Sequence, residues 1–414
     1  MVLLDFFIIG IPVFILLVVG VGTLVGCLVA SGPGHKGPAQ WNFNGNRFYD
    51  ETGGGNNIGF VSAIKWAFTR KRGPWEKYTH YEPGPRPPRQ VEKDKLRVTF
   101  INHATVLVQT EGVNILTDPV FSDRIGPASF GGPKRHRPPG LRFQDLPKID
   151  LVFISHDHYD HLDLPTLRRL QEHSNPMILA GLGNSAFLRR KGLLNVKDLD
   201  WWETTSIRPG FEVTFVPARH YSMRSPVDKN KTLWGSFVVE TVSSKTYFAG
   251  DTGFGPHFEK IGELFGPFDL SLLPIGSFKP RWLMEPNHIS PEEAVAAHRL
   301  LRSKCSIGIH YGTFSLADDG QHDGPRELER VLAKGKSQIV FRILGFGEGT
   351  DIPLTRGAQK SPGRPAVARV SRIEELKDGD FEAANFSEKS RNDALAEPVW
   401  MLDKERRERI TGQA

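Results

Sequence analysis

Short apolar runs separated by polar or glycine-containing segments fill the middle of the chain, between residues 96 and 344. The runs at 96–101, 105–109 and 113–117 are rich in β-branched residues and closely spaced, which predicts a β-meander. The run at 151–155 is apolar up to its last residue, as expected of a strand that is buried on both faces. Further strands are predicted at 177–180, 212–217, 235–240, 246–249, 270–274, 306–309 and 339–344.

Helical patterns are interspersed among these strands. The clearest start is at Ser290, where Glu293 completes a capping box ahead of an apolar run. The predicted helices cover 164–172, 184–191, 258–264, 291–301 and 325–333. Groups of strands with helices between them predict an α/β fold, with sheets inside and helices outside.

The N-terminal pattern is different, because residues 6–30 contain no charged side chain. An apolar stretch of this length is sufficient for a membrane-spanning helix, so residues 1–31 are predicted to be a membrane anchor. A cleaved signal peptide is the alternative, although Asp5 takes the place of the usual basic start. Lys36 and Arg47 follow the segment, which favours a single-pass orientation with the bulk of the protein on the cytoplasmic or matrix side.

The segments that flank the central region are predicted from composition alone. Residues 31–57 are rich in Gly, Asn and Pro and are interpreted as a linker. Residues 58–81 interleave aromatic and basic side chains, which suits either an element at a lipid headgroup interface or a helix packed on the core. After residue 357 the chain becomes polar and is predicted to be a peripheral tail. The predicted organisation is an anchor at 1–31, an N-terminal region at 32–94, a central domain at 95–356 and a tail at 357–414.

Overall charge and cysteine content exclude few partners or kinds of site. The formal net charge is +6 and the sequence pI is about 9.2, which suits an anionic substrate or membrane surface without requiring one. No domain concentrates Lys and Arg, so a nucleic-acid partner is not expected. The two cysteines, Cys27 and Cys305, provide neither a disulfide framework nor a Cys-x-x-Cys metal site.

The strongest chemical signal directly follows the apolar run at 151–154. The sequence there reads Ser155-His156-Asp157-His158-Tyr159-Asp160-His161. Imidazole nitrogens and carboxylate oxygens are preferred ligands of zinc, and this spacing supplies ligands for two adjacent metals. The motif therefore predicts a binuclear metalloenzyme.

The remaining ligands are expected at the ends of later strands. His220 follows the predicted strand at 212–217, Asp251 ends a run before a glycine turn, and His310 ends the predicted strand at 306–309. Each residue alone is more often a hydrogen-bonded structural residue. Together with the histidine cluster, and in this order, they predict a complete site.

Several further motifs show a resemblance to a known family. They are found at 102–106 (Asn-His-Ala-Thr-Val), 116–119, 132–135, 200–203 (Asp-Trp-Trp-Glu), 233–236, 248–254, 265–270, 274–276, 280–282 and 310–314 (His-Tyr-Gly-Thr-Phe). With the ligand motifs, they make the chain resemble the metallo-β-lactamase superfamily and, within it, the N-acylphosphatidylethanolamine-hydrolysing phospholipase D family. The resemblance spans roughly residues 95–349 and implies a four-layered αββα sandwich.

The resemblance also assigns roles to individual residues. It places His156, His158 and His220 on one zinc, Asp160, His161 and His310 on the other, and Asp251 between them. Iron and manganese are alternatives to zinc. Asp118 resembles the carboxylate that orients a ligand imidazole. Such a partner is needed because it fixes the tautomer and the ring orientation of the ligand. Asp160 and Asp251 are the expected catalytic residues. Substrate contacts are expected from His103, Tyr159, Lys279, Arg281 and His288.

The implied reaction is hydrolysis of a membrane phospholipid. Two metals lower the pKa of a shared water and hold an anionic phosphodiester in line for attack. Hydrolysis of an N-acylphosphatidylethanolamine then gives phosphatidic acid and an N-acylethanolamine, and the mitochondrial inner membrane is one location consistent with an anchor. The family resemblance also implies a homodimer. Other hypotheses are a hydrolase of the same fold acting on a lactone or a nucleic acid, and a non-catalytic, metal-containing membrane scaffold.

Overall fold

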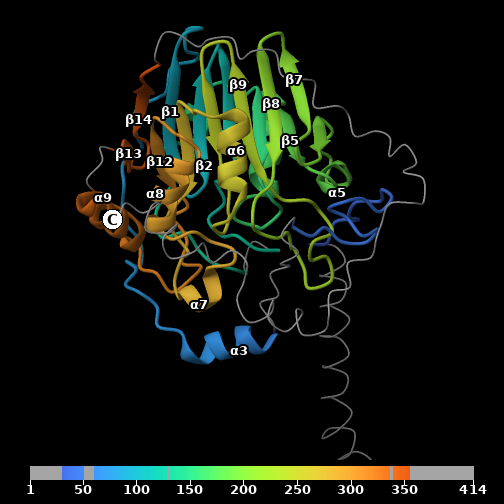
Figure 1. Cartoon of the computed structure of the whole chain (residues 1–414), viewed down its shortest axis with the longest axis vertical. Coiled ribbons are helices and arrows are strands. Elements are labelled where there is room, and N and C mark those ends of the chain that lie inside the picture. The colour runs from blue at the N-terminus through green and yellow to red at the C-terminus, as the bar shows by residue number, and fades with distance from the viewer. Residues whose placement is uncertain (1–29, 51–59, 128–130, 336–338, 355–414) are drawn as a thin grey trace, which may run out of the picture. The chain divides into compact units, whose positions relative to one another are not determined.

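The computed structural model describes residues 30–50, 60–127, 131–335 and 339–354 (Figure 1). Contacts divide the chain into two units, Met1–Leu354 and Thr355–Ala414. The second unit, which contains the predicted tail, lies outside the described residues. The fold below is that of the first unit.

Two seven-stranded sheets form its centre within the described residues. The first sheet has the order β14–β1–β2–β3–β4–β5–β6, and the second has the order β13–β12–β11–β10–β9–β8–β7. The strands of the first sheet are β1 (Leu96–Asn102), β2 (Thr105–Thr110), β3 (Val113–Thr117), β4 (Leu151–Ile154), β5 (Met177–Gly181), β6 (Val196–Leu199) and β14 (Gly349–Ile352). Those of the second are β7 (Thr204–Arg208), β8 (Phe211–Val216), β9 (Ser236–Thr241), β10 (Lys245–Phe248), β11 (Leu270–Pro274), β12 (Ser306–Ile309) and β13 (Phe341–Arg342).

Each sheet combines an antiparallel half with a parallel half. In the first sheet β1, β2 and β3 pair antiparallel through short turns, whereas β3, β4, β5 and β6 run parallel. In the second sheet β7 to β10 are antiparallel and β10 to β13 are parallel. Parallel neighbours require crossover connections, and the connecting helices follow these strands. The carboxyl ends of the parallel strands therefore emerge at one end of each sheet.

Helices cover the outer faces of the two sheets (Figure 1). The first sheet is covered by α4 (Leu164–Ser174) and α5 (Asn184–Arg190), which share an apolar cluster with β4 and β5. The second is covered by α6 (His257–Phe265), α8 (Pro291–Leu300) and α9 (Asp323–Lys334). The other helices of the described residues are α3 (Phe60–Thr69), α7 (Arg281–Met284) and the 3-10 helix η2 (Phe143–Asp145).

Strand β4 shows why the sequence forms these layers. Phe153 stacks on Phe237 of the second sheet with ring centroids 4.4 Å apart, so this side of β4 faces the core between the sheets. Val152 and Ile154 point the other way and pack with α4 and α5 in a second cluster. Because neighbouring side chains of a strand point to opposite faces, an entirely apolar strand fits only between two apolar layers. The fold has the αββα layering that the resemblance implied.

Most predicted elements are present, and the differences occur at sheet edges. We did not predict β6, β7 or β14, and the strand predicted at 339–344 is reduced to Phe341–Arg342. The edge strand β7 reads Thr-Thr-Ser-Ile-Arg and is largely exposed, so it lacks an apolar signal. Strand β14 pairs with β1 from the far end of the domain, a contact that local sequence cannot show.

Part of the segment predicted as a linker packs on the core instead. Phe43 and Phe48 are buried, and isolated bridges join Gln40 to Phe43 and Phe43 to Phe48. The linker interpretation is therefore wrong for this stretch, because two phenylalanines among the Gly and Asn residues provide enough apolar surface to anchor it.

The described residues do not test the predicted membrane anchor. Among the described residues, no helix is both long and apolar enough to cross a membrane. The stretch 6–30 lies outside those residues except for Ala30, so the anchor stays a prediction.

Candidate metal centre

The histidine cluster leaves β4 as a tight, buried turn. The backbone N–H groups of His161 and Leu162 both donate to the carbonyl of His158, at 3.1 and 2.8 Å. This turn directs the side chains of the motif to one place at the carboxyl end of β4. His156 and His161 are almost completely buried there.

The first ligand group consists of three imidazoles. His156 Nε2 lies 2.9 Å from His158 Nδ1, which lies 3.3 Å from Nε2 of His220. His220 is positioned by the loop that follows β8. Burial and the neighbouring imidazoles hold the pKa values of His156 and His220 well below the usual value, so both rings are neutral. Three neutral ring nitrogens that converge on one point match the ligand set of a zinc ion.

The second ligand group combines carboxylates with imidazoles. His161 Nε2 lies 3.4 Å from Asp160 Oδ2 and 3.2 Å from Asp251 Oδ2, while His310 Nε2 lies 3.6 and 3.0 Å from the same two oxygens. Burial alone would raise the pKa values of Asp160 and Asp251, but the neighbouring imidazoles hold both well below the usual value. Neither Nε2 atom has a hydrogen-bond partner among the described residues.

Asp251 lies between the two groups. Its carboxylate is close to His161 and His310, and it also falls within 4.8 Å of ligand atoms of His220 and His288. A carboxylate near ligands of both groups can bridge two cations. The predicted bridging role of Asp251 is consistent with this position.

A second layer of hydrogen bonds orients the ligands. Asp118 Oδ2 accepts from His161 Nδ1 at 2.6 Å and from Ser155 Oγ at 2.6 Å, and the Ser155 hydroxyl in turn lies 2.9 Å from His156 Nδ1. His220 Nδ1 lies 3.1 Å from the carbonyl oxygen of Asn287, which can only accept its proton. A proton held on each Nδ1 leaves the Nε2 lone pair directed inwards.

These observations show that the residues fit divalent metal binding. Three imidazole lone pairs are fixed inwards, and buried ligand nitrogens have no partner within the described residues. Converging lone pairs and paired carboxylates are unfavourable without a cation between them. The site is suited to divalent metals.

The backbone is strained at this site. His103, Asp118 and His310 all have positive φ values, of 46°, 32° and 62°. This left-handed region is costly for residues with a side chain, and such strain clusters at functional sites. Gly250, at φ 59°, precedes Asp251, and a Cβ atom there would lie 2.4 Å from the Cβ of Ser155. Only glycine allows the loops of Asp251 and His156 to approach this closely.

Two of the predicted substrate contacts lie inside the centre. His103 Nε2 is 2.9 Å from Asp160 Oδ2, and its ring lies 4.0 Å from that of His310. His288 Nδ1 is 3.8 Å from Asp251 Oδ2, and its side chain is partly exposed. His103 is thus placed to orient Asp160, whereas His288 lies at the open side of the site.

The other three predicted substrate contacts have partners elsewhere. Tyr159 Oη donates to the carbonyl of Arg224 at 2.9 Å. Lys279 Nζ lies 2.8 Å from Asp323 Oδ2. Arg281 donates to the carbonyl of His288 and to Glu293, both at 2.8 Å. Arg281 therefore holds the loop of His288 in place, and a substrate role for these three residues stays a prediction.

Asp157 is a structural member of the site that sequence reasoning did not single out. Its carboxylate accepts from the backbone of Met223 at 2.7 Å and from Thr232 Oγ1 at 2.8 Å, and Arg224 donates to its carbonyl. These bonds join the loop of His220 to the histidine cluster. Burial raises the pKa of Asp157 to about 6. The sequence signal that could have identified Asp157 was its position as an acidic residue between two ligand histidines, directly after a buried strand.

Comparisons with known proteins identify the family. A model described as the beta-lactamase superfamily domain matches residues 113–311. The N-acyl-phosphatidylethanolamine-hydrolyzing phospholipase D 1 of Caenorhabditis elegans is 41% identical over 61% of this chain and 75% of that protein. The chain belongs to this phospholipase D family of the metallo-β-lactamase superfamily. It is a metal-dependent hydrolase, as the sequence predicted.

Two further comparisons extend this result. The mitochondrial N-acyl-phosphatidylethanolamine-hydrolyzing phospholipase D of Saccharomyces cerevisiae is 36% identical over 57% of this chain and 52% of that protein. The solved structure of a possible metal-dependent hydrolase from Veillonella parvula has a TM-score of 0.51 at 16% identity, covering 62% of this chain and 99% of that one. The second comparison shows a similar fold and nothing more.

Proposed function

We propose that this chain is a zinc-dependent phosphodiesterase of the phospholipase D type, which hydrolyses N-acylphosphatidylethanolamines to N-acylethanolamines and phosphatidic acid. The observation that carries the proposal is the pair of ligand groups joined at Asp251, in a chain 41% identical to a relative of that name. When bound, two zinc ions would lower the pKa of a shared water and neutralise the oxygens of a phosphodiester.

The three histidines of the first ligand group would each offer one nitrogen lone pair to a metal. Ser155 and Asn287 keep a proton on Nδ1 of His156 and His220, so each Nε2 offers a lone pair. His158 turns its Nδ1 to the same point. The chain thus fixes this donor set before a metal arrives, which reduces the reorganisation that binding requires.

Asp160 combines two tasks in the second group. Its Oδ2 atom lies 2.9 Å from His103 and is close to His161 and His310. These contacts keep the carboxylate ionised and fix its orientation, so Asp160 can hold a cation and accept a proton from the attacking water. In the overall reaction the water oxygen bonds to phosphorus and the bond from phosphorus to the N-acylethanolamine oxygen breaks. The departing alcohol keeps its own oxygen and gains the proton.

We extend the proposal to a membrane location. The substrate is a bilayer lipid, and the uncharged stretch 6–30 would keep the enzyme at its surface. The yeast relative is by name a mitochondrial protein, which favours a mitochondrial membrane here. A homodimer remains part of the same hypothesis.

Product analysis in labelled water tests the reaction. Purified full-length protein supplied with zinc is incubated with mixed phospholipid vesicles containing an N-acylphosphatidylethanolamine in ¹⁸O-water, and products are identified by mass spectrometry. We expect unlabelled N-acylethanolamine and phosphatidic acid that carries one ¹⁸O atom. Release of a fatty acid, or of diacylglycerol, would contradict the proposed bond cleavage. The Asp160→Asn variant is the matched control for a contaminating hydrolase.

A further inference from the structure

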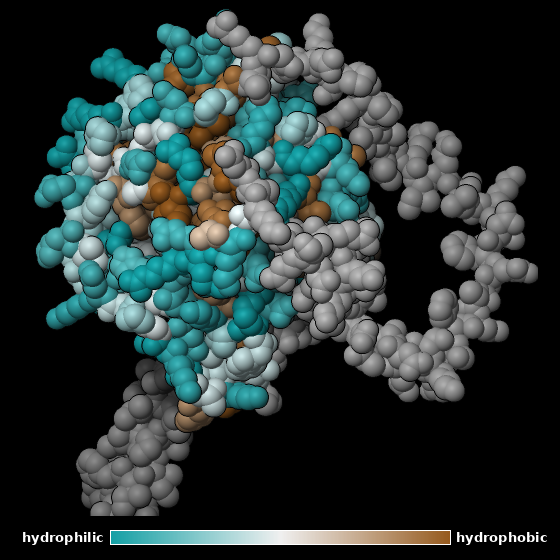
Figure 2. Space-filling view, turned by 60° about the vertical axis from the view of Figure 1, so that its left-hand side comes forward, coloured by the Kyte–Doolittle hydropathy of each residue, from teal (hydrophilic) through white to brown (hydrophobic). Residues whose placement is uncertain are grey.

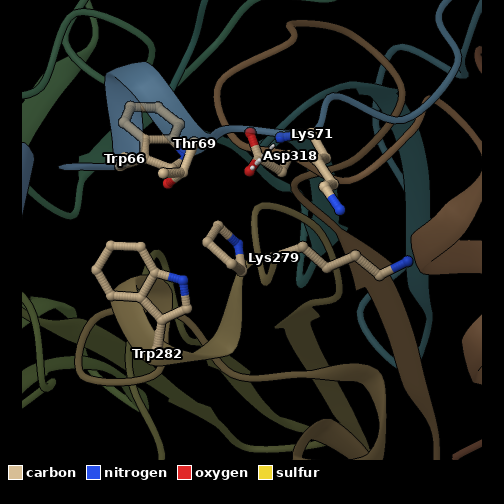
Figure 3. Close-up of a pocket in the computed structure, with 7 residues that line it drawn as sticks. Trp66, Thr69, Lys71, Lys279, Trp282 and Asp318 are labelled. Carbon is tan, nitrogen blue, oxygen red and sulfur yellow. Dashed lines mark hydrogen bonds between the residues drawn. The ribbon is translucent and has the colours of Figure 1, made fainter. Parts of the chain in front are cut away.

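A cleft separate from the metal centre lies between α3 and α7. It has a volume of about 330 Å³ and is lined by Trp66, Thr69, Lys71, Lys279, Pro280, Trp282 and Asp318. Figure 3 shows the indoles of Trp66 and Trp282 on one side, with the side chains of Lys71 and Lys279 extending towards the other. The volume is within the range of small-ligand sites and is sufficient for a phospholipid headgroup.

Hydrogen bonds hold the two walls of the cleft together. The Asp318 carboxylate accepts from Arg70 Nε at 3.3 Å and from the backbone N–H of Lys71 at 3.2 Å. The backbone N–H of Asp318 donates to the carbonyl of Lys279 at 2.9 Å. The Asp318 carboxylate is thus used to attach the segment after α3, and it is partly neutralised there.

The charge that remains around the cleft is positive. Lys65 lies over the Trp282 ring at 5.1 Å, and Arg70 lies over the Trp66 ring at 4.2 Å. Lys279 pairs with Asp323, whereas the ammonium group of Lys71 forms no ion pair within the part of the chain that the structure describes. Four cations and two carboxylates line or flank the cleft. An anionic group is the complementary ligand.

The surface beside the cleft is apolar. Phe68 is 88% exposed, Trp282 is 50% exposed and Ile64 is 41% exposed. In Figure 2 brown, hydrophobic side chains lie next to teal ones at the lowest coloured part of the molecule, where Figure 1 places α3. Exposed aromatic groups next to lysines are typical of an element that lies at a bilayer surface.

The path of the chain also points to a membrane at this end. The uncharged stretch 6–30 ends beside Ser31, whose hydroxyl is 2.5 Å from that of Ser225 in the loop that carries His220. The cleft residues Lys279 and Asp318 follow β11 and β12, so they emerge at the same end of the sheets. A bilayer reached from Ser31 would face the metal centre and the cleft together.

We propose that the cleft between α3 and α7 binds the phosphate of an anionic phospholipid in the bilayer, with the indoles against its glycerol and upper acyl chains. This second lipid is not hydrolysed; it holds the metal centre against the membrane. The proposal rests on the proposed function in one respect, since a hydrolase of bilayer lipids has to work at that surface.

Photolabelling of the full chain tests the proposal. The protein is reconstituted in phosphatidylcholine vesicles with a small fraction of photoreactive phosphatidylglycerol or photoreactive phosphatidylcholine, each with its diazirine near the headgroup. Labelled peptides are mapped by mass spectrometry and normalised to the protein in the vesicles. We expect phosphatidylglycerol to label residues 60–72 and 278–284 more strongly than phosphatidylcholine does.

Charge variants provide the matched comparison. Lys71→Gln and Lys65→Gln should each reduce labelling of these segments by about fivefold, because one lysine near an anionic surface contributes about that factor. Lys148→Gln removes an exposed lysine at the opposite end of β4 and should leave labelling unchanged. Thermal unfolding of each variant checks that the fold is retained.

Three results would overturn the proposal. They are equal labelling by the two lipids, absence of label from both segments, and loss of label when inorganic phosphate is added, which would make free phosphate the ligand. The probe lipid has no N-acyl group, so the test is independent of the catalytic assay. Labelling without hydrolysis of N-acylphosphatidylethanolamine would contradict the proposed function and leave the cleft proposal standing.

Discussion

The metal centre and the cleft between α3 and α7 lie at the same end of the sheets but are built differently. In the centre, buried side chains are fixed by nested bonds, such as those from Asp118 to His161 and Ser155. In the cleft, the lysines are exposed and the indoles are only partly covered. The comparison indicates that the side chains of the metal centre must be held in fixed positions. A bilayer ligand, as proposed for the cleft, requires only charge and apolar surface.

Removal of the metal should produce the largest difference between the metal centre and the cleft. Dialysis against a chelator is expected to abolish hydrolysis, because the imidazoles and carboxylates that remain cannot activate water by themselves. Photolabelling of residues 60–72 and 278–284 should persist. Elemental analysis before dialysis should find two metal equivalents per chain. One equivalent would contradict the proposed two-metal site, and a loss of labelling after chelation would show that the cleft depends on the metal.

The Asp160→Asn substitution should reduce turnover by several orders of magnitude while the protein stays folded. The amide has nearly the same shape, but it neither holds a cation nor accepts a proton. Turnover of detergent-dispersed substrate is the measurement, with circular dichroism as the check on folding. His173→Ala, in α4 and outside the centre, is the control and should have a mild effect. Near-normal turnover of Asp160→Asn would exclude the assigned role.

Asp118→Asn should have a smaller effect on the centre. His161 Nδ1 and the Ser155 hydroxyl share the Oδ2 acceptor, while Oδ1 accepts from the Ser155 backbone N–H, so an amide nitrogen at either position removes an acceptor that the centre uses. Loss of such a partner typically costs about 10- to 100-fold in metal affinity. Zinc titration with a competing chromophoric chelator measures the change. An unchanged affinity would show that His161 is positioned without Asp118.

Phe68→Ala should have the smallest effect on stability. Phe68 is 88% exposed, so its removal should change the free energy of unfolding by less than about 0.5 kcal/mol. Phe153→Ala, in the core between the sheets, is the contrast and should cost about 3–5 kcal/mol. Denaturant titration compares the two. A large loss for Phe68→Ala would show that α3 packs more tightly than its exposure indicates.

The same two regions also differ in what the sequence could predict. His156, His220, Asp251 and His310 each follow a buried strand, so local pattern and chain order were sufficient to find them. Ser155 escaped notice because its role depends on Asp118, which lies 37 residues away in sequence. The partners of Asp118 and Ser155 are set by strand pairing, not by local composition.

The cleft was even harder to predict from the sequence. Trp66 and Trp282 come from segments that are far apart in the sequence, and the aromatic and basic pattern of residues 58–81 fitted a membrane element and a core helix equally well. The exposure of Phe68 and Ile64, which a core helix would not show, is known only once the helix is placed. Edge strand β14 was missed for a related reason, since it pairs with β1 across the domain, whereas β7 pairs with the adjacent β8 and lacks an apolar pattern.

The shared carboxylate of Asp118 has a consequence for how the centre fills. It contacts His161 of one ligand group directly and His156 of the other through Ser155. A cation that fixes either imidazole also fixes Asp118, and with it the ligand on the other side. In the proposed two-metal site this shared carboxylate couples the two ligand groups, so we expect loading of one metal to change the affinity for the other, by the same factor in both directions.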